Sequence, residues 1–332
     1  MIRILQPKTE YIMEYQQAIE FAKSQAEIFW LPDEIDVAKD LHGLKTIFNE
    51  AEYHGVISTL KLFTLYEVHV GQDYWLGYVC KVFDRPDIQR MATTFGFMEI
   101  AVHSVFYSKI NEVLGLDTEE FFNSYLDDPV LKNRMEWIGK KTTKSDTLYN
   151  ILKSIGVFSM IEGAILFSSF AFLKHFNNNG KNKLININSG IDFSIADENI
   201  HAEAGAWLFR TLLTEAINDK AITKDECLLL EEELKETAEI ILEHEKIIIS
   251  KIFDKGAIKG ITDIQLNNFV ESRLDICLNN LGYQPLFKPS YNPIAKWIYK
   301  GIASSTLHDF FNNVGNDYHR AWNEKNFIWG KK

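Results

Sequence analysis

Two pairs of glutamate and histidine are the residues of this sequence best suited to metal chemistry. Glu198 and His201 are three positions apart, and Glu99 and His103 are four apart, so each pair falls on one face of a helix. In helix bundles, two such pairs and one Glu from each of two further helices form a dinuclear carboxylate metal site. The sequence therefore predicts a site of this kind if two more glutamates are buried on neighbouring helices.

Glu67 and Glu162 meet that requirement, because each interrupts an apolar stretch typical of a buried helix. An unpaired carboxylate at Glu162, within the apolar stretch 157–167, would cost several kcal/mol to bury. Four glutamates carry four negative charges, which two divalent ions neutralise. The predicted ligands are Glu67, Glu99, His103, Glu162, Glu198 and His201. A solvated surface position for Glu67 and a hydrogen-bonded core position for His103 are the alternatives for each residue taken alone.

Long helices must carry these residues. Apolar residues recur at three- and four-residue steps, which indicates helices, and no strand-like alternation at sandwich spacing is present. Gly115 ends one helix, Asp117 is expected to cap the next, and Thr223 with Glu226 begins another. The predicted fold is an all-α bundle. Its expected helices cover 55–83, 87–114, 146–174, 190–217, 223–254 and 262–281.

Composition narrows the classes of partner. The 332 residues include 35 Lys and Arg against 46 Asp and Glu, a net charge of -11, which argues against nucleic acid as a partner. Charges or amides interrupt every apolar run, so we expect no membrane span. Three scattered cysteines and an N-terminus without a signal-like apolar region favour a cytoplasmic location.

Several separated motifs resemble the small, radical-generating subunit of class I ribonucleotide reductase, from about Phe29 to Tyr318. The resemblance rests on Phe29-Trp30-Leu31-Pro32-Asp33-Glu34, Leu60-Lys61-x-x-Thr64-Leu65-x-Glu67, His103-Ser104-Val105-Phe106-Tyr107, Asp197-Glu198-x-x-His201, and Phe310-Phe311 followed by Tyr318. It implies a ferritin-like bundle over 1–300 and a tail over 301–332 that docks on the large subunit. It also implies a homodimer.

The same resemblance implies the chemistry. The dinuclear centre would hold two iron ions, with manganese/iron and dimanganese as alternatives, and would react with O₂. Tyr107 would store the resulting radical, which Trp30, Asp197 and Tyr318 would pass to the large subunit, where ribonucleotides are reduced to deoxyribonucleotides. Leu166 and Phe170 are candidates for an apolar wall around the radical, and each is also an ordinary core residue.

Two departures from the family pattern bear on the radical. The spacing between Glu99 and His103 is one residue longer than usual, which predicts a π-helical widening between them. Counted from His103 the radical residue is Tyr107, and counted from Glu99 it is Phe106; the intact His-Ser-x-x-Tyr motif favours Tyr107. Glu67 replaces a commoner Asp, as in members thought to use manganese/iron without a radical tyrosine.

Two other functions remain open from the sequence. One is a stand-alone ferritin-like di-metal oxidase or ligand-binding oxidase, which would not need Trp30 with Asp197 or an aromatic tail. The other is an iron-storage or structural helical protein, in which Glu162 and Tyr107 would be incidental.

Overall fold

Every regular element in the described part of the chain is a helix. The computed structural model describes residues 2–11, 13–178 and 181–299, and no strand occurs among them. The predicted all-α class is confirmed. The elements are η1 (Arg3–Leu5), α1 (Gln16–Glu27), η2 (Pro32–Glu34), α2 (Ala38–Thr46), α3 (Glu50–His69), η3 (Val70–Val79), α4 (Cys80–Val82), α5 (Pro86–Phe97), η4 (Met98–His103), α6 (Ser104–Leu114), α7 (Glu119–Asp127), α8 (Pro129–Thr142), α9 (Leu148–Met160), η5 (Ile161–Ile165), α10 (Phe167–His175), α11 (Ile185–Asn218), α12 (Lys224–Ile252) and α13 (Asp263–Leu281).

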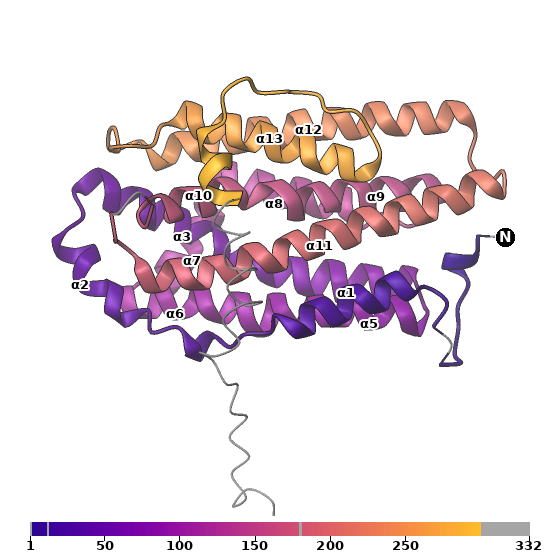
Figure 1. Cartoon of the computed structure of the whole chain (residues 1–332), viewed down its shortest axis with the longest axis horizontal. Helices are drawn as coiled ribbons and strands as arrows, with labels where there is room; N and C mark the ends of the chain where they lie inside the picture. Colours follow the sequence, from indigo (N-terminus) through magenta and orange to yellow (C-terminus); the bar gives the residue numbers. More distant parts are fainter. Residues whose placement is uncertain (1, 12, 179–180, 300–332) are drawn as a thin grey trace, which may run out of the picture.

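Four long helical rods form the central bundle (Figure 1). Three of them contain a π-helical segment (η3, η4 or η5), where the backbone hydrogen bonds run from i to i+5. The rod segments η3, α5 and η4 pack together, as do α9, η5 and α11. The rods are α3–η3–α4 over 50–82, α5–η4–α6 over 86–114, α9–η5–α10 over 148–175, and α11 over 185–218.

Further helices cover the bundle from two sides. The helices α12 and α13 form a layer over α9, η5 and α10, and α1 packs against α5 and α11 (Figure 1). The rod over Leu148–His175 has a mean hydropathy of 1.8 in its most apolar window, and that window is completely buried. By length and composition alone it could cross a membrane, although Glu162 interrupts its apolar sequence, as expected. Its burial identifies it as a core helix.

Local capping explains where the helices begin and end. Gly115, with a φ of 73°, ends α6 as predicted, and Thr223 with Glu226 forms the expected capping box of α12. The expected cap at Asp117 is wrong, because the hydroxyl of Thr118 accepts the bond from the backbone N–H of Phe121 at 3.2 Å.

The predicted start at residue 55 is five residues late, because a capping box of Asn49 and Glu52 begins α3 at Glu50. Those first residues are polar, so apolar periodicity does not mark them. At the other end, the predicted tail over 301–332, which includes Tyr318, lies outside the described residues.

Candidate metal centre

The structure brings all six predicted ligands together in the middle of the bundle, and every one of them is buried. Their ligand atoms form two groups, and within each group the atoms lie within 4.8 Å of one another. Glu99 and Glu198 belong to both groups, so two adjacent positions share two carboxylates. The first position is Glu67, Glu99, His103 and Glu198, and the second is Glu99, Glu162, Glu198 and His201.

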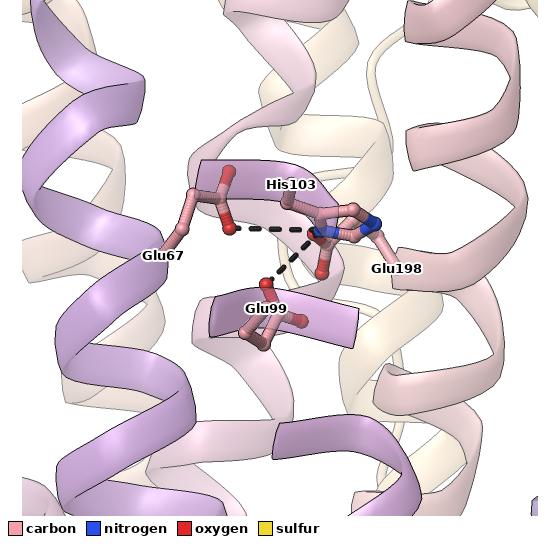
Figure 2. Close-up of side chains that lie close together, drawn as sticks. All are labelled: Glu67, Glu99, His103 and Glu198. Carbon is pink, nitrogen blue, oxygen red and sulfur yellow. Dashed lines mark hydrogen bonds and ion pairs between the residues drawn. The ribbon is translucent and has the colours of Figure 1, made fainter. Parts of the chain in front are cut away.

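At the first position, three carboxylates surround one imidazole nitrogen (Figure 2). The Nδ1 atom of His103 lies 3.0 Å from Glu99 Oε2, 3.4 Å from Glu198 Oε1 and 3.7 Å from Glu67 Oε2. Glu99 and His103 both belong to η4, a π-helical segment, so the predicted widening between them is confirmed. The wider turn brings two side chains that are four residues apart to the same point.

At the second position, Nδ1 of His201 lies 2.7 Å from Glu99 Oε1 and 3.8 Å from Glu198 Oε2. Despite the short distance, neither Nδ1 of His201 nor Oε1 of Glu99 makes a hydrogen bond. Glu162 reaches this position from η5, and its Oε1 accepts a hydrogen bond from Nε1 of Trp75 at 2.8 Å. Trp75 belongs to η3, on a different rod.

The outer nitrogens of the two histidines have different partners. His103 Nε2 lies 2.8 Å from Oδ2 of Asp197, and His201 Nε2 lies 3.1 Å from Oε1 of Gln25. Gln25 in turn donates through Nε2 to Oδ1 of Asp197 at 2.6 Å. Because these oxygens can only accept, both Nε2 atoms carry a proton. Each Nδ1 faces the carboxylates instead, and after losing its own proton it can offer a lone pair to an ion there, as a metal-binding histidine does.

Burial makes this cluster unfavourable without cations. Burial, with the nearby charge of Glu99, raises the pKa of Glu67 well above its ordinary value, and burial together with Glu198 does the same for Glu162. Burial also acts to raise the pKa of Glu99, but His103 and His201 outweigh it and hold that pKa low. Five ligand atoms have no hydrogen-bond partner: Glu67 Oε1, Glu99 Oε1, Glu198 Oε1, Glu198 Oε2 and His201 Nδ1.

These orphaned atoms are carboxylate and imidazole donors, a set that suits iron or manganese. Two divalent ions would neutralise the four carboxylates and supply the four orphaned oxygens and Nδ1 of His201 with a partner. The side chains therefore fit a dinuclear metal site. Gln25 and Trp75, which contact the predicted ligands, were not predicted, because no spacing relates them to a Glu–His pair.

Tyr107 and Phe106 have separate surroundings. Tyr107 is completely buried, its hydroxyl donates to Oγ of Ser194 at 3.1 Å, and its ring stacks on Phe63 with centroids 4.3 Å apart. Burial and the nearby Glu67 carboxylate raise the pKa of Tyr107 well above 10. Phe106 instead contacts the edge of Trp30, with centroids 5.4 Å apart.

The two candidates for the apolar wall, Leu166 and Phe170, are both buried, and Phe170 stacks on the far side of the Tyr107–Phe63 pair. His69, by contrast, is exposed and pairs with Asp73 at 2.6 Å, so it takes no part in the cluster.

Trp30 is connected to the first position through one carboxylate oxygen. Its Nε1 donates to Oδ2 of Asp197 at 2.9 Å, and the same oxygen accepts from His103. All three side chains are buried. The predicted Trp30–Asp197–His103 contact is therefore present, whereas Tyr318 lies outside the described residues.

The fold and this cluster define a class: a ferritin-like helical bundle with a buried dinuclear carboxylate–histidine site. The chain belongs to the ribonucleotide reductase small chain family, whose model matches residues 9–293. Membership makes it a class I small subunit, which implies a large subunit as its partner.

Sequence relatives of the chain belong to the same family. The chain is 28% identical over 310 residues to a probable ribonucleoside-diphosphate reductase small subunit of Invertebrate iridescent virus 3, covering 88% of this chain and 79% of the relative. It is 25% identical over 306 residues to the ribonucleoside-diphosphate reductase subunit beta of Chlamydia pneumoniae, covering 89% and 85%.

Two solved structures share the fold. A putative class I ribonucleotide reductase from Bacillus halodurans matches with a TM-score of 0.76 at 22% identity, covering 86% of this chain and 99% of that one. The dimanganese(II) NrdF of Streptococcus sanguinis matches with a TM-score of 0.72 at 21% identity, covering 88% and 98%.

Proposed function

We propose that this small subunit reacts with O₂ at its dinuclear centre and stores the oxidising equivalent as a radical on Tyr107. The observation that carries the proposal is the pair of adjacent positions that share Glu99 and Glu198, with a buried phenol beside the first of them. Shared carboxylates hold two ions close together, and two-metal sites generally place them roughly 3.5 to 4 Å apart.

The six residues have distinct roles in this proposal. Glu67 and His103 would hold the first ion, Glu162 and His201 would hold the second, and Glu99 and Glu198 belong to both positions. When bound, a reduced pair of iron or manganese ions supplies the electrons for the reduction of O₂. We propose two iron ions, with manganese/iron and dimanganese as the alternatives; the Streptococcus sanguinis structure, described as dimanganese(II), supports the last.

Tyr107 would lose one electron to the oxidised centre, its phenolic proton being taken up as O₂ is reduced to water, and would become a neutral radical. Phe106 has no acidic proton and is much harder to oxidise. The enclosed position of Tyr107, between Phe63 and the hydroxyl of Ser194, keeps water and reductants away from the radical.

The oxidising equivalent leaves through Trp30. The indole N–H of Trp30 donates to Asp197, so the carboxylate can accept the proton when Trp30 loses an electron. His103 donates to the same oxygen and connects this pair to the metal centre. From Trp30 the equivalent passes to Tyr318 in the tail and then to a cysteine of the large subunit.

We further propose a homodimer, a ferritin-like small-subunit domain over 1–300 with a tail over 301–332 that docks on the large subunit, and a cytoplasmic location. Exposed apolar side chains at Val68, Phe97 and Val105 lie on the rods over 50–82 and 86–114, and they support a dimer contact between these rods. A monomer at micromolar concentration in sedimentation would contradict the dimer.

The test combines the full chain with metal, O₂ and the large subunit, and it measures deoxyribonucleotide formed and the electron paramagnetic resonance spectrum. We expect product only when both subunits are present, together with a tyrosyl signal. O₂ consumption without partner-dependent product would instead indicate a stand-alone oxidase.

A further inference from the structure

Arg273 is a buried cation that forms no ion pair with a carboxylate in the described part of the chain. It belongs to α13, outside the four rods, and only 4% of its surface is exposed. The other two buried arginines form ion pairs, Arg85 with Asp87 and Arg134 with Glu245, each at 2.7 Å. No ion pair joins Arg273 to any carboxylate of the described residues. A buried charge needs compensation, so its neutral contacts must be favourable and well oriented.

Arg273 contacts two residues that each follow a predicted ligand in the sequence, and these two residues belong to different rods. The Nε atom of Arg273 donates to the backbone oxygen of Gly163 at 2.8 Å, and Nη2 donates to Oδ1 of Asn199 at 3.0 Å. Gly163 follows Glu162 in η5, and Asn199 follows Glu198 in α11. One planar guanidinium, with its donors in a fixed fork, therefore bridges the two rods next to both glutamates.

The backbone oxygen of Gly163 accepts a hydrogen bond from outside its own helix. Where a helix changes from i+4 to i+5 bonding, as in η5, backbone carbonyls lose their usual partners, and a buried carbonyl must be satisfied elsewhere. Arg273 satisfies the carbonyl of Gly163. It thereby fixes the backbone position immediately after Glu162.

Close packing keeps α13 in place against η5. A Cβ atom on Gly163 would lie 2.3 Å from Sγ of Cys277, so only glycine permits this approach. Cys277 is four residues after Arg273, on the same face of α13. The guanidinium carbon also lies 3.6 Å from the ring centroid of Phe167, at the start of α10. These contacts leave Arg273 little freedom to move.

We infer that Arg273 is a positioning residue that fixes the distance between Glu162 and Glu198 and so completes the second metal position. The inference rests on the proposed dinuclear centre. Arg273 touches neither ion nor any ligand side chain. It acts through Gly163 and Asn199. Its loss should weaken binding of the second ion more than binding of the first, because Glu67 and His103 lie on rods that Arg273 does not contact.

The test is a titration of the metal-free full chain with Mn(II) in the absence of O₂ and of the large subunit. Calorimetry gives the number of ions and their affinities, and electron paramagnetic resonance distinguishes a coupled pair from isolated Mn(II). The variants are Arg273→Lys, which keeps the charge without the fork, Arg273→Gln, and Asn199→Ala, a mild change at a half-buried position. Arg85→Lys is the matched control. Arg85 is equally buried, but it donates to Asp87 and Glu14, and neither of these residues is next to a predicted ligand in the sequence.

We expect two ions in the wild-type protein. Arg273→Lys and Asn199→Ala should bind the first ion normally and the second about tenfold more weakly, and Arg273→Gln up to about 100-fold more weakly. The spectrum should shift toward isolated Mn(II), whereas Arg85→Lys should bind both ions normally.

Two normal affinities in all three variants would overturn the inference while leaving the metal centre intact. An equal loss in Arg85→Lys would also overturn it, because the effect would then reflect general destabilisation. Wild-type protein that binds fewer than two ions would contradict the proposed centre itself, and the role of Arg273 with it.

Discussion

The two halves of the metal centre use the same ligand types but have different surroundings. The outer nitrogen of His103 faces a carboxylate, Asp197, which also binds Trp30. The outer nitrogen of His201 faces the neutral amide of Gln25. A carboxylate partner makes a ligating imidazole more basic than an amide does. The first half is thus connected by charge and hydrogen bonds to the proposed radical route.

The second half is supported mainly by neutral donors. Trp75 donates to Glu162, and Arg273, the one cation here, donates to the backbone beside it rather than to the carboxylate. Tyr107 is close to Glu67, on the first half. Under the proposed function this difference divides the roles: the first half would exchange electrons and protons with the protein, and the second half would be held in place.

The largest effect should follow from Tyr107→Phe, which removes the phenol beside the first half. We expect turnover with the large subunit and the tyrosyl signal to disappear while both ions still bind, because Tyr107 is not a ligand. Phe106→Leu, one residue away, is the control and should keep the signal. Retained turnover with a signal from the metal pair would mean that the metals store the oxidant, the alternative that Glu67 raises.

Glu162→Ala should remove the second ion and leave the first. Glu162 belongs only to the second group of ligands, so the metal content should fall from two ions to one. Elemental analysis after loading and desalting measures it. Glu245→Gln is the control, since Glu245 is an equally buried glutamate that pairs with Arg134 outside the cluster. An unchanged metal content in Glu162→Ala would exclude it as a ligand.

The sequence predicted the Glu–His pairs of this centre more directly than its two lone glutamates, Glu67 and Glu162. Glu99 and His103 are on one helix, and their spacing differs by one residue from Glu-x-x-His, so both the pair and the π-segment η4 could be predicted. Glu162 has no histidine three or four residues away on its own rod. Nothing in its spacing therefore reveals η5, although its apolar surroundings did identify it as a ligand candidate.

The supporting residues could not be predicted for a similar reason. Gln25, Trp75 and Arg273 come from α1, η3 and α13, and they meet the ligands only after the chain has folded. Each is an ordinary helix residue in the sequence. Trp30 and Asp197 were predicted only because they lie in motifs that resemble the family.

Asp197→Asn tests the connection between the first half and Trp30. The amide keeps the shape but removes the negative charge that His103 and Trp30 share. We expect partner-dependent turnover to fall about 100-fold, at the upper end of effects for residues that support metal ligands. Gln25→Leu should lower it only a few-fold, because Gln25 does not contact Trp30. Equal losses in the two variants, measured by product formation, would remove the proposed asymmetry.

The pH dependence of the metal-free protein tests the raised pKa values of Glu67 and Glu162. Above about pH 4.3, where a Glu of the unfolded chain loses its proton, the folded chain still holds these protons, so stability falls as the pH rises. Tm measured by circular dichroism should therefore decrease from about pH 5 to pH 8.

Metal binding displaces the same protons, so Mn(II) affinity should rise about tenfold per pH unit for each proton displaced. Glu162→Gln should flatten both trends, because it removes one of the titrating groups. A Tm that increases over this range would contradict protonated glutamates in the metal-free cluster.

We expect the smallest effect from Trp75→Phe. This variant removes a hydrogen bond to the ligand Glu162 and leaves the ligand itself in place. The indole N–H donates to Oε1 of Glu162, and phenylalanine fills much of the same space without a donor. A hydrogen bond to a charged group contributes about 1.5–3 kcal/mol, but ligation of an ion by Glu162 compensates part of that loss. We therefore expect the second Mn(II) to bind about three- to tenfold more weakly and the first ion to bind unchanged. Calorimetric titration measures both affinities. If the affinity for the first ion falls as much as the affinity for the second, Trp75 stabilises the bundle as a whole. The second half would then have no support of its own from η3.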